Sequence, residues 1–144
     1  MPFIDASIIV SIACEEPGSD VLIDRLEAEG GPFYYSALTR VDAAMAFARR
    51  MADAKGKGSP VTPDMIETGQ EIVDQFLKDI GAKEISIMGD IGKKALEAAQ
   101  RYGKIVNHEA QLSTSACLTY ACAKGYRLKV AHRKDEFRKT DISW

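Results

Sequence analysis

Short apolar segments alternate with longer amphipathic ones along this chain, and this alternation constrains the fold more than any other feature of the sequence. The segments at 2–5, 32–37, 83–88 and 127–132 are short and rich in apolar residues, as strands are. The longer segments between them place apolar residues at helical spacing. Strands separated by helices in this way are typical of a parallel sheet flanked by helices, so we expect an α/β fold.

Local signals refine the predicted helices. Ser7 is a suitable N-cap for the helix that follows the first strand. Residues 38–54 are rich in Ala, Met and Arg and predict a strong helix, with Val41, Met45 and Ala48 along one apolar face.

Length and composition favour one globular domain covering residues 1–144, with 46% hydrophobic and 28% charged residues. No apolar run reaches the roughly 18 to 20 residues of a membrane span. The chain starts without a basic lead-in, which argues against a signal peptide, so we expect a cytoplasmic protein. Cys14, Cys117 and Cys122 lack CxxC spacing and are expected to be buried apolar residues rather than disulfide partners or zinc ligands.

Acidic residues from distant parts of the chain are predicted to meet at one edge of the sheet. Parallel sheets place functional groups at the carboxyl ends of their strands. Asp5 ends the first predicted strand, and Asp42 lies about one turn into the helix after the second. Asp135 and Glu136 follow the last strand. Ala116, at the start of the helix before that strand, is expected at the same edge.

Carboxylates gathered in one cleft repel one another unless a divalent cation offsets their charge. Oxygen ligands favour Mg²⁺ or Mn²⁺ over zinc or copper. Such an ion can bind a phosphate oxygen and lower the pKa of a bound water, which produces a nucleophile for phosphodiester hydrolysis. The acids therefore predict a magnesium or manganese site.

A basic segment surrounds the C-terminal pair of acids. Between residues 124 and 139 the basic side chains are Lys124, Arg127, Lys129, Arg133, Lys134, Arg138 and Lys139. A solvated surface is the ordinary explanation of such a run. Because the run flanks the proposed cleft, we also expect Arg133, Lys134, Arg138 and Lys139 to contact the phosphates of a nucleic acid.

Four segments resemble, in order, those of VapC-type PIN-domain ribonuclease toxins of bacterial type II toxin–antitoxin systems: IDASIIV, YSALTRVDAAMAFARR, QLSTSACLTYACAKG and VAHRKDEFRKTDI. The resemblance covers nearly the whole chain. It implies a three-layer α/β/α PIN-like domain with a central, mainly parallel sheet, and a Mg²⁺-dependent endoribonuclease activity. The implied metal ligands are Asp5, Asp42 and Glu136, with Asp135 as a further catalytic acid and Ser7, Thr114 and Ser115 as residues supporting the ligands.

This chain departs from the family pattern at three positions. Members usually carry Glu at position 42, Asp at 116 and Asp at 136. Asp42 and Glu136 keep the negative charge but change its reach by one methylene. Ala116 removes a ligand altogether, so we predict impaired cleavage. A natural loss and an engineered inactivation both fit Ala116, and Asp135 can act in place of Glu136 or beside it.

The family resemblance further implies a VapB-like antitoxin, an RNA substrate, a homodimer, and operator DNA bound only through the antitoxin, with no membrane partner. The alternative is a non-catalytic PIN-scaffold module that binds antitoxin or RNA. Structural roles remain open for the acids: Asp5 as a helix cap, Asp42 as a solvated helical acid paired with Arg49 or Lys55, and Asp135 and Glu136 as part of a surface turn. A flavodoxin-like or receiver domain shares the alternation, but the sequence shows neither a phosphate loop nor paired acids after the first strand.

Overall fold

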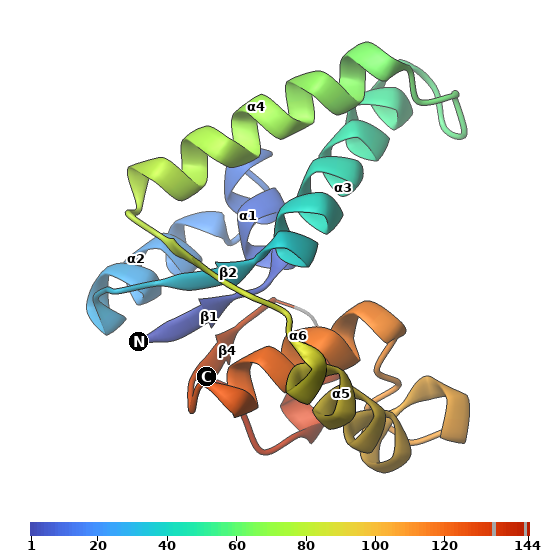
Figure 1. The fold of residues 1–144 in the computed structure, drawn as a ribbon. Coiled ribbons are helices and arrows are strands. Elements are labelled where there is room, and N and C mark those ends of the chain that lie inside the picture. Colours follow the sequence, from blue (N-terminus) through green and yellow to red (C-terminus); the bar gives the residue numbers. More distant parts are fainter. Residues whose placement is uncertain (134, 143) are drawn as a thin grey trace.

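A computed structural model describes residues 1–133, 135–142 and 144, and only the backbone of Asp135 and Glu136. In this part of the chain a four-stranded sheet runs in the order β3-β2-β1-β4, and all of its neighbouring strands are parallel (Figure 1). The strands are β1 (Pro2–Ile4), β2 (Tyr34–Ser36), β3 (Lys83–Ile85) and β4 (Lys129–Ala131). The regular strands are shorter than the predicted segments, and each lies inside one of them.

Helices cover both faces of the sheet, which confirms the three-layer α/β/α fold (Figure 1). One layer contains α1 (Ala6–Ala13), α2 (Ser19–Glu29), α3 (Ala37–Lys55) and α4 (Pro63–Asp79). The other contains α5 (Gly89–Tyr102) and α6 (Thr114–Gly125). Two short 3-10 helices, η1 (Lys104–Val106) and η2 (Asp135–Lys139), complete the described elements.

The burial of both sheet faces explains why the strand sequences are rich in apolar residues. Phe3 and Val130 are fully buried against the α5–α6 layer, whereas the next residues, Ile4 and Ala131, are fully buried against the α1–α4 layer. Successive side chains of a strand point to opposite faces, and both faces of this sheet are covered. The central strands are therefore apolar at successive positions.

The first helix starts earlier than predicted, and Ser7 is not its cap. Asp5 is the N-cap, because its carboxylate accepts a hydrogen bond from the backbone N–H of Ser7 at 3.0 Å. Asp is as effective an N-cap as Ser, and Asp5 is the residue that leaves β1 in an extended conformation. The Ser7 hydroxyl instead accepts the backbone N–H of Arg133 at 3.1 Å.

The predicted apolar face of α3 is wrong in part. Ala48 is buried, but Val41 and Met45 are 54% and 52% exposed. The cause is a close approach of α3 to α4, in which Gly69 packs against the backbone of Ala44. Only small residues fit between helices at this separation, so four alanines of α3 are buried while Val41 and Met45 are exposed.

The cysteines behave as predicted. Cys117 and Cys122 are buried, Cys14 is partly buried, and all three are free thiols. Burial raises the pKa of the Cys122 thiol to about 11, which keeps it protonated. Among the helices of the described residues, none combines the length and apolar character needed to span a membrane.

Candidate functional site

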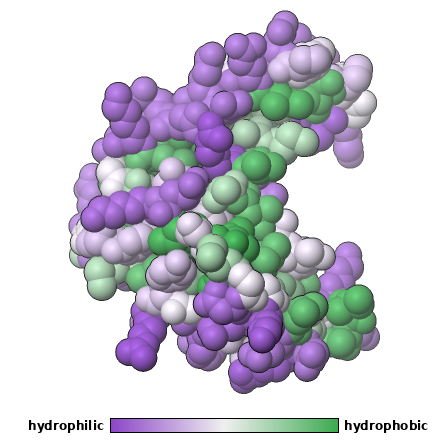
Figure 2. All heavy atoms as spheres, viewed as in Figure 1, coloured by the Kyte–Doolittle hydropathy of each residue, from purple (hydrophilic) through white to green (hydrophobic). Residues whose placement is uncertain are grey.

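A polar pocket of about 430 Å³ lies where the residues after β1, β2 and β4 meet the start of α6. Figure 2 shows the molecule hollowed between the α3–α4 arm and the α5–α6 layer. The pocket is lined by residues of α1 and α3, by the start of α6, and by Glu16 and Arg133. Its polar lining residues are Ser7, Glu16, Asp42, Arg50, Ser113, Ser115 and Arg133. We call this cavity the polar pocket.

Asp5 lies directly before two residues that line the polar pocket, Ala6 and Ser7. Its side chain is only 6% exposed, and its backbone N–H donates to the Ala131 carbonyl at 2.9 Å, which joins the ends of β1 and β4. The cap on α1 uses Oδ2. A helix cap at Oδ2 is compatible with cation binding at Oδ1, so the two roles considered for this residue do not exclude each other.

Asp42 lies in the first turns of α3, is half-buried, and lines the polar pocket. It already makes an interaction within the chain. The guanidinium of Arg49, one of the partners considered for it, pairs with Asp53 at 2.9 Å on the same helix. The position of Asp42 on the pocket wall comes from the capping box of Ser36 and Thr39, which begins α3 immediately after β2.

Residue 116 lies in the first turn of α6. Ser113 is the N-cap of this helix, and its hydroxyl accepts the Ala116 backbone N–H at 3.2 Å. The Ala116 side chain is 6% exposed and belongs to the apolar cluster between the sheet and α5–α6. The helix start thus reaches the polar pocket through Ser113 and Ser115, whereas Ala116 is buried in the apolar cluster and is not one of the residues that line the pocket.

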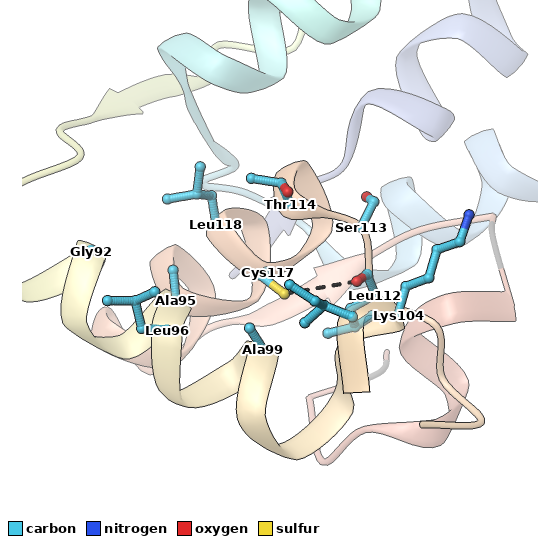
Figure 3. Close-up of a pocket in the computed structure, with 11 residues that line it drawn as sticks. Gly92, Ala95, Leu96, Ala99, Lys104, Leu112, Ser113, Thr114, Cys117 and Leu118 are labelled. Atoms are coloured by element: carbon cyan, nitrogen blue, oxygen red, sulfur yellow. Dashed lines mark hydrogen bonds between the residues drawn. The ribbon is translucent and has the colours of Figure 1, made fainter. Parts of the chain in front are cut away.

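The predicted supporting residues separate into two places. Ser7 and Ser115 line the polar pocket. Thr114 instead lines a larger apolar cavity of about 670 Å³ between α5 and α6, together with residues such as Leu96 and Leu118 (Figure 3). Successive residues of a helix differ in direction by about 100°, so neighbouring hydroxyls cannot all face one site.

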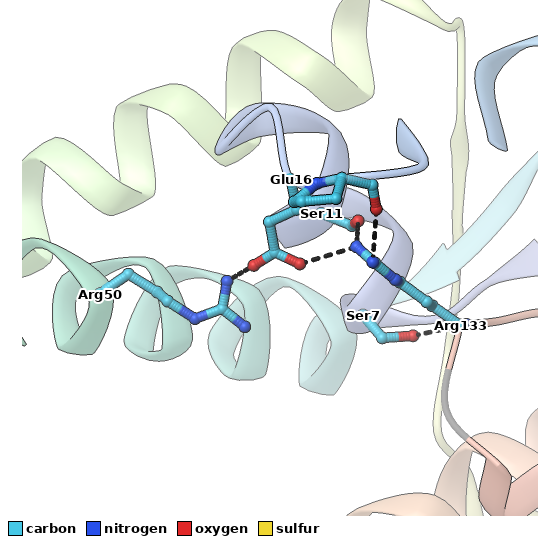
Figure 4. A network of polar contacts seen from close by, with 6 residues as sticks. Ser7, Ser11, Glu16, Arg50 and Arg133 are labelled. Atoms are coloured by element: carbon cyan, nitrogen blue, oxygen red, sulfur yellow. Dashed lines mark hydrogen bonds and ion pairs between the residues drawn. The ribbon is translucent and has the colours of Figure 1, made fainter. Parts of the chain in front are cut away.

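Arg133 is held by contacts within the chain. Its Nη1 contacts Glu16 Oε2 at 2.8 Å and also donates to the Ser11 hydroxyl, and its Nη2 donates to the Pro17 carbonyl at 2.6 Å (Figure 4). Glu16 contacts Arg50 Nη1 through its other carboxylate oxygen. One carboxylate is therefore shared by two guanidinium groups at the wall of the polar pocket.

Sequence reasoning missed Glu16 and Arg50. The chain has one Glu–Glu sequence, Glu15–Glu16, and one Arg–Arg sequence, Arg49–Arg50, and no local pattern indicates that Glu16 faces Arg50. Only the packing of α3 beside the end of α1 brings this pair together.

The remaining predicted site residues lie toward the C-terminus. Lys139 is exposed and its Nζ lies 3.7 Å from Glu109, and Arg138 is exposed and makes an interaction within the chain. Lys134 and the side chains of Asp135 and Glu136 lie outside the described residues. In the part of the chain with placed side chains, three or more His, Cys, Asp or Glu residues do not gather into a metal-binding group.

Residues 3–143 match the PIN domain family. A VapC ribonuclease of Rhizobium meliloti, R02377, is 38% identical over 143 residues, which cover 99% of both chains. The chain belongs to the VapC-type PIN-domain family. Ribonuclease VapC42 of Mycobacterium tuberculosis is 29% identical over 139 residues, with 96% of this chain and 95% of VapC42 covered.

Solved structures of a VapC toxin and of a toxin–antitoxin complex share the fold. VapC20 of Mycobacterium tuberculosis, a toxin that cleaves the sarcin–ricin loop, superposes with a TM-score of 0.67 at 10% identity over 99% of this chain and 96% of its own. A toxin–antitoxin complex from Klebsiella pneumoniae gives the same TM-score at 16% identity, over 100% and 96% of the two chains. The family and the fold predicted from the sequence are thereby confirmed.

Proposed function

We propose that this VapC-type protein is a Mg²⁺-dependent endoribonuclease toxin by descent whose cleavage of RNA is impaired by Ala116. The observation that carries the proposal is the arrangement at the polar pocket: Asp42 on its wall, Asp5 beside it, and the first turn of α6 reaching it without a carboxylate.

The residues present fit a magnesium or manganese ion only in part. Asp5, Asp42 and Glu136 would hold it, with Asp135 acting beside Glu136 or in its place. Carboxylates suit either cation. A bound ion would supply Lewis-acid activation of water and phosphate. The nearby Ser113 hydroxyl is neutral and already accepts a backbone N–H, so it is a poor substitute for the carboxylate usual at position 116 in the family.

The decisive experiment compares cleavage of total RNA by the protein and by Ala116→Asp, each with Mg²⁺ or with EDTA. We expect Ala116→Asp to raise Mg²⁺-dependent cleavage by at least about tenfold, because loss of even an indirect contact to a metal ligand typically costs 10- to 100-fold. A new carboxylate in the first turn of α6 is also favoured by the helix dipole.

Ala116→Asp/Asp42→Asn is the matched control and should return to the original level, and circular dichroism checks that the new buried acid has not unfolded the protein. Equal cleavage by the protein and by Ala116→Asp would contradict the impairment. Silence of both folded proteins would favour the second candidate, a non-catalytic module that binds antitoxin or RNA. The Arg50 and Arg133 side chains at the polar pocket favour that candidate.

The partners follow from the same proposal. A VapB-like antitoxin would cover the polar pocket, the toxin would form a homodimer in the cytoplasm, and operator DNA would be bound only through the antitoxin. The structural similarity to a toxin–antitoxin complex supports the antitoxin partner. Size-exclusion chromatography with light scattering, with and without a co-expressed antitoxin, measures both assemblies.

A further inference from the structure

Two guanidinium groups share one carboxylate at the polar pocket. Glu16 contacts Arg50 through Oε1 and Arg133 through Oε2 (Figure 4). With the Asp42 carboxylate on the same wall, the four charged side chains that line the pocket carry no net charge. A phosphate beside the Arg50 guanidinium therefore meets no net negative charge from them.

The two arginines differ in how much hydrogen-bonding capacity they retain. Arg133 uses Nη1 and Nη2 on Ser11, Glu16 and the Pro17 carbonyl. Arg50 contacts Glu16 through Nη1, is 52% exposed, and lines the polar pocket. A guanidinium has five N–H donors, so Arg50 keeps donors for a ligand in the pocket.

The hydroxyl groups of the pocket can also act as donors. The hydroxyls of Ser7 and Ser113 each accept a backbone N–H, so their own protons are directed to a different acceptor. Ser115 adds a third hydroxyl on the same wall. The carboxylates of Glu16 and Asp42 already make interactions within the chain, and Ala116 adds no charge. The pocket thus offers hydroxyl donors beside the Arg50 guanidinium.

We infer that the polar pocket binds a backbone phosphodiester of single-stranded RNA through Arg50, that Glu16 competes with this phosphate for the guanidinium, and that no metal ion is needed. This inference deepens the proposed function and rests on its RNA partner. Arginine matches the geometry of a phosphate through two parallel N–H donors. Contacts of this kind position RNA without reading its sequence.

The test measures binding of a short fluorescent single-stranded RNA to the full chain by anisotropy in EDTA, at several salt concentrations. Arg50→Met should weaken binding about tenfold, since a charge-assisted hydrogen bond to phosphate is lost. It should also reduce the slope of log K against log salt by about one, because one phosphate contact is lost. Arg49→Met is the matched control. Arg49 is the neighbouring residue of α3, pairs with Asp53, and should bind RNA as the unaltered protein does.

Glu16→Gln should change the affinity for RNA in the opposite direction. It removes the competing charge and should tighten RNA binding about threefold. A change of this size corresponds to the free energy of an exposed ion pair. A purely structural role for this cluster would make both Arg50→Met and Glu16→Gln weaken binding or unfold the protein. Circular dichroism on each variant separates loss of folding from loss of binding. Arg50→Lys keeps the charge but not the paired donors, so its affinity for RNA should lie between those of the unaltered protein and of Arg50→Met.

Two results would overturn the inference. One is equal RNA binding by Arg50→Met and Arg49→Met, and the other is weaker RNA binding by folded Glu16→Gln than by the unaltered protein. A DNA strand of the same sequence and inorganic phosphate serve as competitors. Equal competition by DNA would assign the pocket to phosphodiesters in general, and displacement by low concentrations of inorganic phosphate would reject RNA as the ligand. The RNA-binding assay contains no metal, so its failure is distinguishable from failure of Ala116→Asp to restore cleavage.

Discussion

At the residue scale, single positions have more than one physical role, and Asp5 is the clearest case. The same carboxylate caps α1 and lies beside the polar pocket. Its position between β1 and α1 follows from local sequence, because an Asp leaving a strand is a strong helix start. Capping and cation binding depend on different properties of the side chain, namely a hydrogen-bond acceptor in one case and a negative charge in the other.

These two properties of Asp5 can be separated by substitution. Asp5→Asn keeps an acceptor for the Ser7 N–H, so it should change the melting temperature little. Asp5→Ala removes the cap and should cost about 1 kcal/mol, or roughly 2–4 °C in Tm. In an Ala116→Asp background, both variants should abolish Mg²⁺-dependent RNA cleavage. Retained cleavage in Asp5→Asn would show that the residue is only a cap. Thermal unfolding and RNA gels provide the two measurements.

At the element scale, the contact between α3 and α4 determines which side chains reach the polar pocket. Four alanines of α3 are buried, and Asp42 and Arg50 lie on a different part of the helix, which faces the pocket. Gly69 of α4 permits this approach, because a Cβ at that position would lie 2.6 Å from the Ala44 carbonyl oxygen. Arg40 and Asp74 add a paired contact between the same helices, with bonds of 2.5 and 2.8 Å.

Glycine-to-alanine substitutions test this close approach. Gly69→Ala should lower the free energy of unfolding by about 1–3 kcal/mol, because the helices must separate. Gly92→Ala is the control: its Cβ would meet nothing within 4 Å in α5, so the gain in helix propensity should raise the free energy of unfolding by about 0.5–1 kcal/mol. Urea unfolding measures both values. If Gly69→Ala stabilised the protein, α3 and α4 would have to lie farther apart than they do in the structure.

At the scale of the whole molecule, polar contacts attach the C-terminal segment to both layers. Asp141 accepts the Tyr120 hydroxyl at 2.7 Å and also contacts the Lys124 ammonium, which ties the segment to α6. Trp144 donates its indole N–H to the His132 carbonyl at 3.0 Å, and the Arg25 guanidinium of α2 lies over its ring. The C-terminal segment, which follows β4 and includes the last predicted acids, is therefore held near its end by the contacts of Asp141 and Trp144.

Acid should weaken two polar contacts, the Arg40–Asp74 pair between α3 and α4 and the contacts of Asp141 with Lys124 and Tyr120. The Arg40 hydrogen bond lowers the pKa of Asp74. Burial opposes ionisation of Asp141, but hydrogen bonds from Lys124 and Tyr120 still lower its pKa. A lowered pKa in the folded state means that the unfolded state takes up protons first. Stability from both groups is thus complete above the ordinary carboxylate pKa and is lost as pH falls through the lowered values.

Each of these two pairs is more than one third exposed, so each loss is expected to be modest, about 0.5–1 kcal/mol after solvent screening. Urea unfolding between neutral and acidic pH measures it. Asp141→Asn should show a shallower decline than the unaltered protein, and an unchanged slope would contradict the assignment of this group.

The sequence by itself determined the element order, the parallel sheet, the family and the sheet edge at which Asp5 and Asp42 lie. These depend on local patterns: apolar periodicity, capping residues and the order of motifs along the chain. Only the tertiary structure decided that Thr114 faces a different cavity from Ser115, that Val41 and Met45 are exposed, and that Glu16 lies between Arg50 and Arg133. Such pairings depend on the separation and rotation of packed helices, which arise from contacts between residues far apart in the chain and leave no periodic trace in the sequence.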